Sequence, residues 1–345
     1  MIKPENLIIV RTDRIGDVVL SLPLAKIIKG KYPECKITFL VREYTKNLVQ
    51  NHPFIDNYLT LIEENGKIPI GKNAAQIKNF SFDSSVIVYP TFHTALIIFL
   101  ARIKFRIGTG YRWYSPLFNK KVYDHRKYAE KHELEFNVNL LKYFGIEKDI
   151  NINNVEFDLS VSENNKLKVK NLLAEKKVNL SKQLLIVHPG SGGSSVDLPV
   201  QKFKELIEMI DKNLDMQILL TGSESETETC SYLNISEHTF NLAGELSLEE
   251  MIALISMSNV FISNSTGPLH IASALGKYII GFYPKILSCS AKRWGPYTSK
   301  AHVFEPEIKC ENCNREQCER LNCMNTINME KVFSELRQIL KSRIN

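Results

Sequence analysis

Residues 260–284 read VFISNSTGPLHIASALGKYIIGFYP, and their order predicts a strand, a polar turn, a helix and a second strand. Ser265, Thr266 and Gly267 stand where the helix begins, and Pro268 fits its first turn without losing a hydrogen bond. Unpaired backbone N–H groups and the helix dipole make such a terminus a seat for phosphate. His270 follows one turn later and either faces the same site or is a buried structural histidine behind an ordinary cap.

The same alternation of strand and helix runs through both halves of the chain. Apolar runs at 7–10, 36–41 and 84–89 predict strands in the first half, and runs at 183–188, 216–221 and 260–263 predict strands in the second. Helical patterns separate them, at 200–212 and 248–257 for example. The pattern predicts an α/β protein with two doubly wound parallel sheets, and a length of 345 residues suits two domains.

A Lys-, Asn- and Glu-rich helical stretch at 161–182 links the two halves. We expect one domain over 1–170, a second over 171–327, and a separate terminal helix over 328–345. The apolar stripe of that helix requires a packing surface, which is either the second sheet or, across the molecule, the first domain.

Composition narrows the class further. The chain has 44% hydrophobic and 24% charged residues, as globular proteins do, and no apolar run long enough to span a bilayer. Its start has no signal-peptide pattern, so we expect a cytoplasmic protein. A net charge of +6 suits anionic ligands or an anionic membrane face and does not require nucleic acid.

The turn after the first strand holds Asp13, Arg14, Gly16 and Asp17. Ligands of open parallel sheets bind at the carboxyl ends of the strands, so a carboxylate here faces the cleft. An Asp at such a turn can also be a plain helix cap.

A glycine-rich segment, HPGSGGSS at 188–195, follows the first strand of the second half. Gly190, Ser191, Gly192 and Gly193 allow a ligand to approach the backbone closely and supply donors for phosphate, unless the segment is a flexible surface loop. It matches neither the dinucleotide fingerprint nor the Walker loop, which disfavours a dehydrogenase.

Four cysteines lie within one short segment, at Cys310, Cys313, Cys318 and Cys323. This spacing predicts a tetrahedral thiolate site for zinc or iron, and a reducing cytoplasm disfavours disulfides. A closed four-thiolate site has no open position for substrate, so we expect it to staple the loop.

At six motifs in order, the chain resembles the ADP-heptose:lipopolysaccharide heptosyltransferases, glycosyltransferase family 9. The motifs are IIVRTDRIGDVVLSLP (8–23), HPGSGG (188–193), TGSESE (221–226), NLAG (241–244), SNSTGPLH (263–270) and RWGPY (293–297). The resemblance implies a GT-B architecture of two Rossmann-like domains facing a cleft, with the acceptor on the first and the nucleotide sugar on the second. It also implies inverting transfer of heptose from ADP-heptose to a lipopolysaccharide core or related surface glycan, at the cytoplasmic face of the inner membrane. In that architecture the final helix commonly returns to the first domain.

The resemblance also assigns roles to residues. Asp17 matches the proposed general base. Ser191 with its glycine neighbours, and Thr266 with Gly267, match residues that hold the diphosphate without a divalent ion, so no metal is expected for transfer. Glu226 matches an acidic position near the ribose, and Ser265 and His270 belong to the donor loop.

The chain departs from the family pattern at two positions. The segment Ser195–Pro199 lacks the usual basic residue, and Ser265 stands where an Asp is common. Lys285, Lys292 or Arg293 could supply the missing positive charge. These departures keep two other functions open: heptose transfer to protein serines, as in an iron-bearing relative, and sugar-nucleotide binding without catalysis.

A basic and aromatic stretch in the first half suits a phosphorylated glycolipid or an anionic membrane, unless it is only a solvated face. With Arg14 from the first turn, Arg106 and Arg112 of this stretch are the expected acceptor-binding residues.

Overall fold

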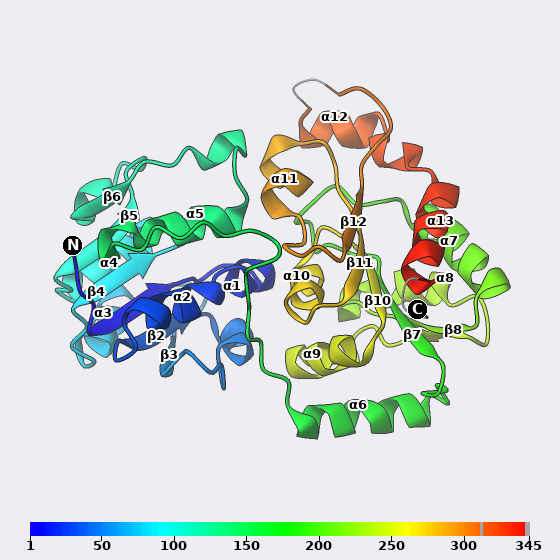
Figure 1. The fold of residues 1–345 in the computed structure, drawn as a ribbon, viewed down its shortest axis with the longest axis horizontal. Helices are drawn as coiled ribbons and strands as arrows, with labels where there is room; N and C mark the ends of the chain where they lie inside the picture. The colour runs from blue at the N-terminus through cyan, green and yellow to red at the C-terminus, as the bar shows by residue number, and fades with distance from the viewer. Residues whose placement is uncertain (311–312, 342–345) are drawn as a thin grey trace. The chain divides into compact units, whose positions relative to one another are not determined.

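The computed structural model describes residues 1–310 and 313–341, which form two compact units. The first unit comprises Met1–Arg126 and Lys131–Ser160, and the second comprises Lys127–Glu130 and the chain from Val161 onward (Figure 1). The second unit therefore begins at Val161 rather than at residue 171. The reason is that α6 (Glu163–Glu175) buries Val169 and Leu173 and packs on α9 (Leu248–Met257) of that unit.

The first unit holds a parallel six-stranded sheet in the order β3-β2-β1-β4-β5-β6. Its strands are β1 (Asn6–Val10), β2 (Lys36–Val41), β3 (Asn57–Thr60), β4 (Ser84–Ile87), β5 (Phe105–Thr109) and β6 (Lys120–Val122). Its helices are α1 (Ile15–Val19), α2 (Pro23–Lys31), α3 (Ile70–Lys78), α4 (Phe92–Leu100) and α5 (Glu133–Asn139). The sequence predicts one helix where α1 and α2 stand; Pro23 begins the second because it lacks the N–H that would continue the first.

The second unit repeats the plan, with sheet order β12-β11-β10-β7-β8-β9. Its strands are β7 (Gln183–His188), β8 (Met216–Leu220), β9 (Thr239–Asn241), β10 (Val260–Asn264), β11 (Tyr278–Phe282) and β12 (Ala301–Phe304). Its remaining helices are α7 (Val200–Asn213), α8 (Thr227–Leu233), α10 (Gly267–Ala274), α11 (Ala291–Trp294), α12 (Arg315–Arg320) and α13 (Met329–Lys341). All strand pairs of both sheets in the described chain are parallel, which confirms the predicted fold class.

Helix α13 packs on α7 and β11 within the second unit (Figure 1). Its apolar stripe, which includes Val332 and Leu336, joins the same buried cluster as Phe203 and Phe282. Of the two packing surfaces that the sequence leaves open, the second sheet and its helices are the one on which the structure packs this helix. The apolar face of α13 is buried against α7, a helix that belongs to the same unit.

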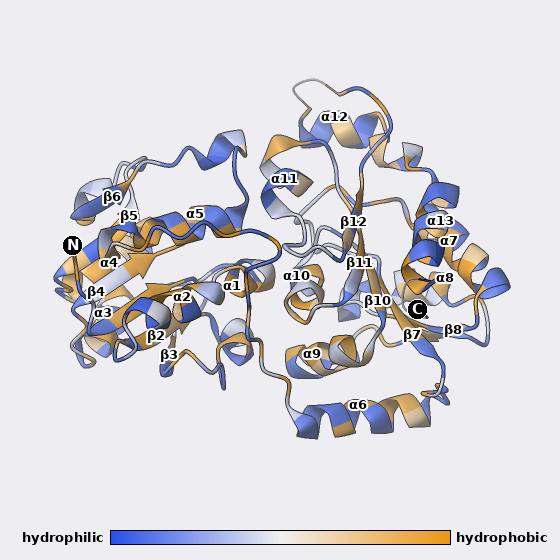
Figure 2. Ribbon diagram, viewed as in Figure 1, coloured by the Kyte–Doolittle hydropathy of each residue, from blue (hydrophilic) through white to orange (hydrophobic). Residues whose placement is uncertain are grey.

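The cores follow the hydropathy of the strands (Figure 2). The central strands β1, β7 and β10 are almost wholly buried, as expected where helices cover both faces of a parallel sheet. Within the described ranges, none of the helices combines the length and apolar character that a membrane span requires.

In both sheets the strand order reverses beside the first strand of the unit, between β1 and β4 and between β7 and β10. Doubly wound sheets bind ligands at the carboxyl ends of the strands at this reversal point. The loops after β1, β7 and β10, which the sequence singles out, all leave the sheets there.

Candidate functional site

The first unit places a buried arginine among three carboxylates at the end of β1. Arg11 is 1% exposed; its Nε lies 2.8 Å from Asp13 Oδ1, and its Nη1 lies 3.6 Å from Glu133 Oε1. Its Nη2 donates a hydrogen bond to Asp17 Oδ1. Burial opposes the charge of Arg11, but the three carboxylates outweigh it and raise its pKa, so the guanidinium is a fixed positive centre.

Asp13 and Asp17 form a pair of acids beside that guanidinium. Burial raises the pKa of Asp13 to about 7; Arg11 opposes this shift, and the charge and hydrogen bond of Asp17 add to it. The Ser21 hydroxyl donates to the main-chain carbonyl of Asp17, 2.9 Å away, and so satisfies a carbonyl at the C-terminal end of α1. A proton can therefore be held or released beside Asp17 near neutral pH.

Two of the three expected acceptor residues, Arg14 and Arg112, have exposed side chains. Arg14 is the exposed N-cap residue of α1 and stands three residues before Asp17. Arg112 is exposed after β5, beside Trp113, whose ring is stacked on Phe92 with centroids 4.8 Å apart.

Arg106 does not present its charge in the same way. Its Nε donates to the carbonyl of Leu117 over 2.8 Å and its Nη1 to that of Ile103 over 2.7 Å. The guanidinium also covers the ring of Phe99, and burial lowers its pKa. Arg106 thus holds the loops around β5, which argues against the acceptor role that the sequence suggests.

The second unit joins its glycine-rich loop and the loop after β10 by hydrogen bonds between side chains and backbone. Asn264 Nδ2 donates to Pro189 O over 2.5 Å, and Asn264 Oδ1 accepts from Leu198 N over 2.8 Å. The Ser194 hydroxyl donates to Ser265 O over 2.8 Å. The loop after β7 and the loop after β10 are therefore one site.

The backbone of this site is shaped for close approach of a ligand. Gly192 and Gly193 have φ of +57° and +75°, in the left-handed region, and a Cβ on either would meet no atom within 4 Å. Thr266 is the extended N-cap residue of α10, and its hydroxyl makes no capping hydrogen bond. Gly267 opens the helix, so its first N–H groups lie beside that hydroxyl.

Two acidic side chains border the glycine-rich loop. Glu226 accepts hydrogen bonds from the backbone N–H and hydroxyl of Ser223, at 2.7 and 2.8 Å. Burial raises the pKa of Asp197, against hydrogen bonds from Ser191, and Glu226 adds to the rise.

Both histidines of the donor motifs are buried. His188 Nδ1 lies 3.0 Å from the Thr221 hydroxyl, and burial lowers its pKa to about 4 against the opposing charge of Glu226. The ring is therefore neutral at physiological pH. His270 is 5% exposed within α10.

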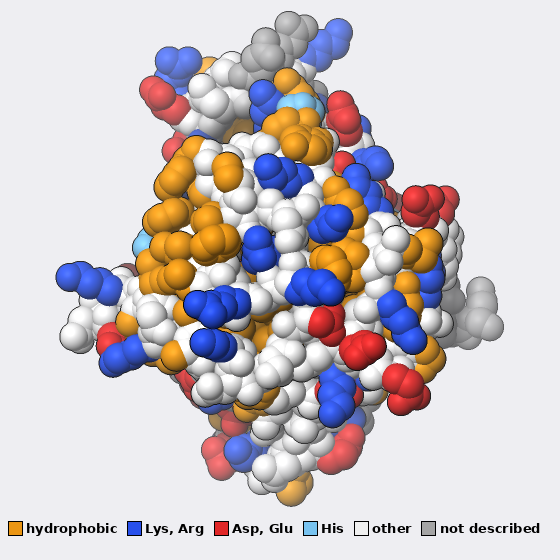
Figure 3. Space-filling view, turned by 90° about the vertical axis from the view of Figure 1, so that its left-hand side faces the viewer, with side chains coloured by type: hydrophobic (Ala, Val, Ile, Leu, Met, Phe, Trp, Pro, Cys, Tyr) orange, Lys and Arg blue, Asp and Glu red, His pale blue; other side chains and the backbone are white. Residues whose placement is uncertain are grey.

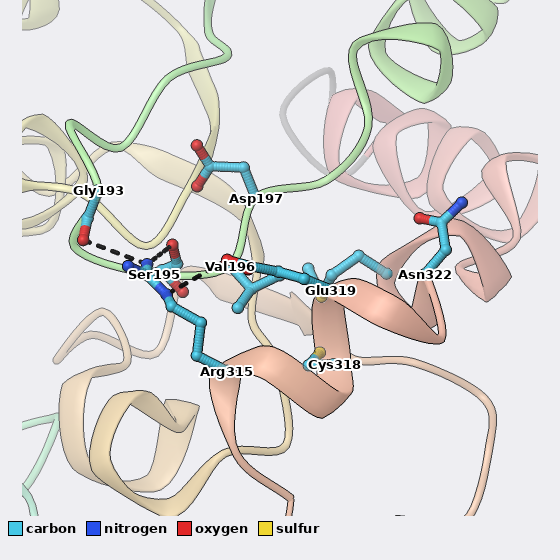
Figure 4. A pocket seen from close by; sticks show the side chains of 9 residues that line it. Gly193, Ser195, Val196, Asp197, Arg315, Cys318, Glu319 and Asn322 are labelled. Carbon is cyan, nitrogen blue, oxygen red and sulfur yellow. Dashed lines mark hydrogen bonds and ion pairs between the residues drawn. The ribbon is translucent and has the colours of Figure 1, made fainter.

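The positive charge absent from the loop sequence is found on another segment. Lys285 donates to Ile308 O over 2.8 Å, and Arg293 lies over the ring of Trp294. Arg315 instead reaches the glycine-rich loop, donating to Gly193 O over 3.2 Å and to Ser195 O (Figure 4). No motif in the sequence signals this contact, because Arg315 lies more than a hundred residues away among the cysteines.

The four cysteine thiols gather at that segment. Cys318 and Cys323 are buried, Cys310 and Cys313 are partly buried, and hydrogen bonds join neighbouring thiols of the set. Burial, with the neighbouring thiols adding, raises the pKa of Cys318 to about 12. In the part of the chain that the structure describes, no three metal-ligating side chains adopt the arrangement of a metal site. The cluster is assembled, but its geometry is that of packed thiols.

A family model for glycosyltransferase family 9 (heptosyltransferase) matches residues 70–324. The chain belongs to this family. It is a glycosyltransferase, and the two Rossmann-like units are those of the GT-B architecture.

Individual family members show how far the likeness extends. Family member OpsX, the lipopolysaccharide core heptosyltransferase of Haemophilus influenzae, is 23% identical over 361 residues, which covers 97% of each chain. The solved structure of Escherichia coli ADP-heptose lipopolysaccharide heptosyltransferase II matches with a TM-score of 0.77 and 21% identity, over 99% of this chain and 100% of that one.

A more distant fold match is the iron-containing dodecameric glycosyltransferase TibC of enterotoxigenic Escherichia coli. It matches with a TM-score of 0.58 and 12% identity, over 98% of this chain and 77% of that one. At this identity the likeness concerns the fold alone.

Proposed function

We propose that this glycosyltransferase moves heptose from ADP-heptose to a lipopolysaccharide core or related surface-glycan acceptor, with inversion at the anomeric carbon. The observation that carries the proposal is the joined pair of loops after β7 and β10. They combine two glycines of left-handed backbone conformation with Thr266, the N-cap residue of α10, whose hydroxyl makes no capping hydrogen bond. Such a pair of loops suits a diphosphate, and the family supplies ADP-heptose as the donor to test first.

In the proposed mechanism Asp17 accepts the proton of the acceptor hydroxyl as that oxygen bonds to the anomeric carbon. The bond from the anomeric carbon to the ADP oxygen breaks, and ADP leaves with the electron pair. Arg11 fixes the position of the Asp17 carboxylate, while Asp13 sets the charge beside it.

The departing ADP would be held by the second unit. The N–H groups of Gly192, Gly193 and Gly267 and the hydroxyls of Ser191 and Thr266 can donate to its phosphates, which stabilises the leaving charge without a divalent cation. Glu226 would accept from the ribose hydroxyls, with Gly190 leaving room for its carboxylate; Ser265 and His270 complete the donor loop.

Isothermal titration with ADP, UDP, GDP and NAD tests the donor assignment. Selective ADP binding supports the proposal. Selective UDP or GDP binding would contradict ADP-heptose as the donor but leave transfer of another nucleotide sugar possible. No binding of any of the four nucleotides would contradict the assignment of these loops as a nucleotide-sugar site.

On the acceptor side, Arg14 and Arg112 are the proposed contacts to an anionic glycolipid. Figure 3 shows Lys and Arg side chains interspersed with apolar ones on one face of the first unit, and Trp113 is 76% exposed beside Arg112. This composition suits a peripheral position on the cytoplasmic face of the inner membrane. Sedimentation with anionic liposomes should weaken with salt and in Arg112→Ala; unchanged binding of that variant would contradict the assignment.

The cysteine cluster supports two further proposals. Four adjoining thiols are a donor set that zinc or iron accepts, so we propose that Cys310, Cys313, Cys318 and Cys323 hold a structural metal whose bonds would close the segment. The second candidate function is transfer of heptose to protein serines, with which an iron-binding thiol cluster would be compatible. A peptide acceptor assay beside the glycolipid assay separates the two.

A further inference from the structure

The cysteine-rich segment and the glycine-rich loop enclose one pocket of about 410 Å³. Gly193, Ser195 and Asp197 line it from the loop, and Arg315, Cys318 and Glu319 line it from the segment (Figure 4). Both belong to the second unit, although the chain separates them by more than a hundred residues. The proposed donor site and the cysteine cluster are therefore neighbours.

Arg315 makes the polar link across this pocket. Its Nη2 donates to the carbonyls of Gly193 and Ser195, while its Nε lies 3.5 Å from Glu319 Oε1 on the next turn of α12. Hydrogen bonds from a charged donor are about twice as strong as those between neutral groups. Arg315 of the cysteine-rich segment thus forms hydrogen bonds to the glycine-rich loop at two carbonyls.

These hydrogen bonds matter because ordering the glycine-rich loop costs conformational entropy. Gly192 and Gly193 lose more conformational freedom on ordering than any other residue type would. A peptide carbonyl and the N–H of the next residue point in opposite directions within one plane. Fixing the carbonyls of Gly193 and Ser195 therefore fixes the peptide planes that join Gly193 to Ser194 and Ser195 to Val196. The Ser194 N–H in the first of these planes donates to Ser191 O over 3.2 Å, so the same planes limit the turn that contains the glycine pair.

Arg315 is in turn placed by the cysteines. It is the first residue of α12 and lies two positions after Cys313, and Cys318 is buried one turn further along. The thiol of Cys318 interacts with those of Cys313 and Cys323, so the start and the end of the segment are joined behind the arginine. A change in the cluster would move the base from which Arg315 extends.

We propose that Arg315 is a positioning residue for the donor diphosphate, and that through it the state of the cysteine cluster controls donor binding. The proposal rests on the proposed function of the loop as the diphosphate site. The proposal requires the four thiols to stay in contact, either through a bound metal or through direct contacts between the thiols.

The first test compares Arg315→Met with Arg320→Met, a matched loss of charge from an exposed position of the same helix. In the full-length chain, Arg315→Met should weaken ADP binding about tenfold while leaving adenosine binding and Tm unchanged. Arg320→Met should leave all three unchanged. Arg315→Lys should recover part of the loss, because its ammonium can still donate to one carbonyl.

Hydrogen exchange without nucleotide separates this inference from the proposed function. Peptides covering 189–197 should exchange faster in Arg315→Met than in the parent or in Arg320→Met. Unchanged exchange together with unchanged ADP affinity would overturn the role of Arg315. Faster exchange in Arg315→Met, together with a parent chain that binds no ADP, would support the positioning role and contradict the donor assignment.

A double-variant cycle tests the link to the cluster. Cys313→Ser or Cys323→Ser should weaken ADP binding in the parent but cause little further loss in the Arg315→Met background. Fully additive losses for both cysteine variants would overturn the control by the cluster. Measuring Tm for each variant ensures that affinities are compared between folded proteins.

Discussion

The carboxylate of Glu226 occupies the space that a side chain at position 190 would need. A Cβ on Gly190 would lie 1.5 Å from Glu226 Oε1, and that carboxylate is held by Ser223. Gly190 and Glu226 come from loops after different strands, β7 and β8. The absence of a side chain at Gly190 therefore allows the carboxylate of Glu226 to lie against the glycine-rich loop.

Gly190→Ala should expel the Glu226 carboxylate and reduce nucleotide affinity at least tenfold. Gly30→Ala is the matched control, because a Cβ there meets no atom within 4 Å. Titration calorimetry with ADP measures both. Parent-like affinity in Gly190→Ala would show that Glu226 does not contribute to nucleotide binding.

Asp17→Ala should reduce kcat by about two to four orders of magnitude, the range for loss of a general base, with donor affinity nearly intact. Asp149→Ala, at an exposed position of the same unit, should be neutral. Turnover with ADP-heptose and a core acceptor measures the effect. Comparable turnover in Asp17→Ala would remove Asp17 from the base role.

Activity should rise with pH through about 7, where burial places the pKa of Asp13. Below this pH Asp13 is protonated and neutral; above it, Asp13 places a negative charge beside Asp17, which favours movement of the acceptor's proton toward this pair of acids. Asp13→Asn should flatten the kcat/KM profile between pH 6 and 8. The hypothesis fails if the variant keeps the slope of the parent.

The chain should purify with about one zinc or iron per molecule, bound by the four thiols. Elemental analysis of the parent and of Cys318→Ser, which should lose most of the metal, measures this. A metal-free parent with full activity would leave the cluster as packed thiols, as the structure describes it.

Leu336→Ala should lower the free energy of unfolding by about 2–5 kcal/mol, because Leu336 is fully buried in the core of the second unit. Arg337→Ala, at the exposed neighbouring position, should change it by less than about 0.5 kcal/mol. Denaturant unfolding of both variants provides the comparison. Equal effects would contradict the packing of α13.

Local patterns were sufficient to predict most of the fold. The strands Gln183–His188 and Lys36–Val41 and the helix Leu248–Met257 have the predicted bounds, because each is set by the period of its own apolar residues. The partner of α13 was not predictable in this way. An apolar stripe shows that a helix packs, and only the tertiary fold shows that its partner is α7.

The site divides along the same line. The sequence predicts the strands that precede Asp17, Ser191 and Thr266. In the structure these residues lie after β1, β7 and β10, the strands beside which the strand order reverses. Arg315 could not be found, since its hydrogen bonds to Gly193 and Ser195 depend on the path of the cysteine-rich segment. For Arg106 the charge pattern could not show that Nε and Nη1 donate to carbonyls of Leu117 and Ile103 within the fold.

The place of α13 also bears on how such enzymes can diversify. With this helix, the chain from Val161 onward completes its own apolar core, and the first unit has a separate one. Neither core borrows a helix from the other within the described residues. We therefore expect that residues 1–160 can be exchanged for those of a relative, giving a chimera that keeps its choice of nucleotide sugar and acquires a different acceptor.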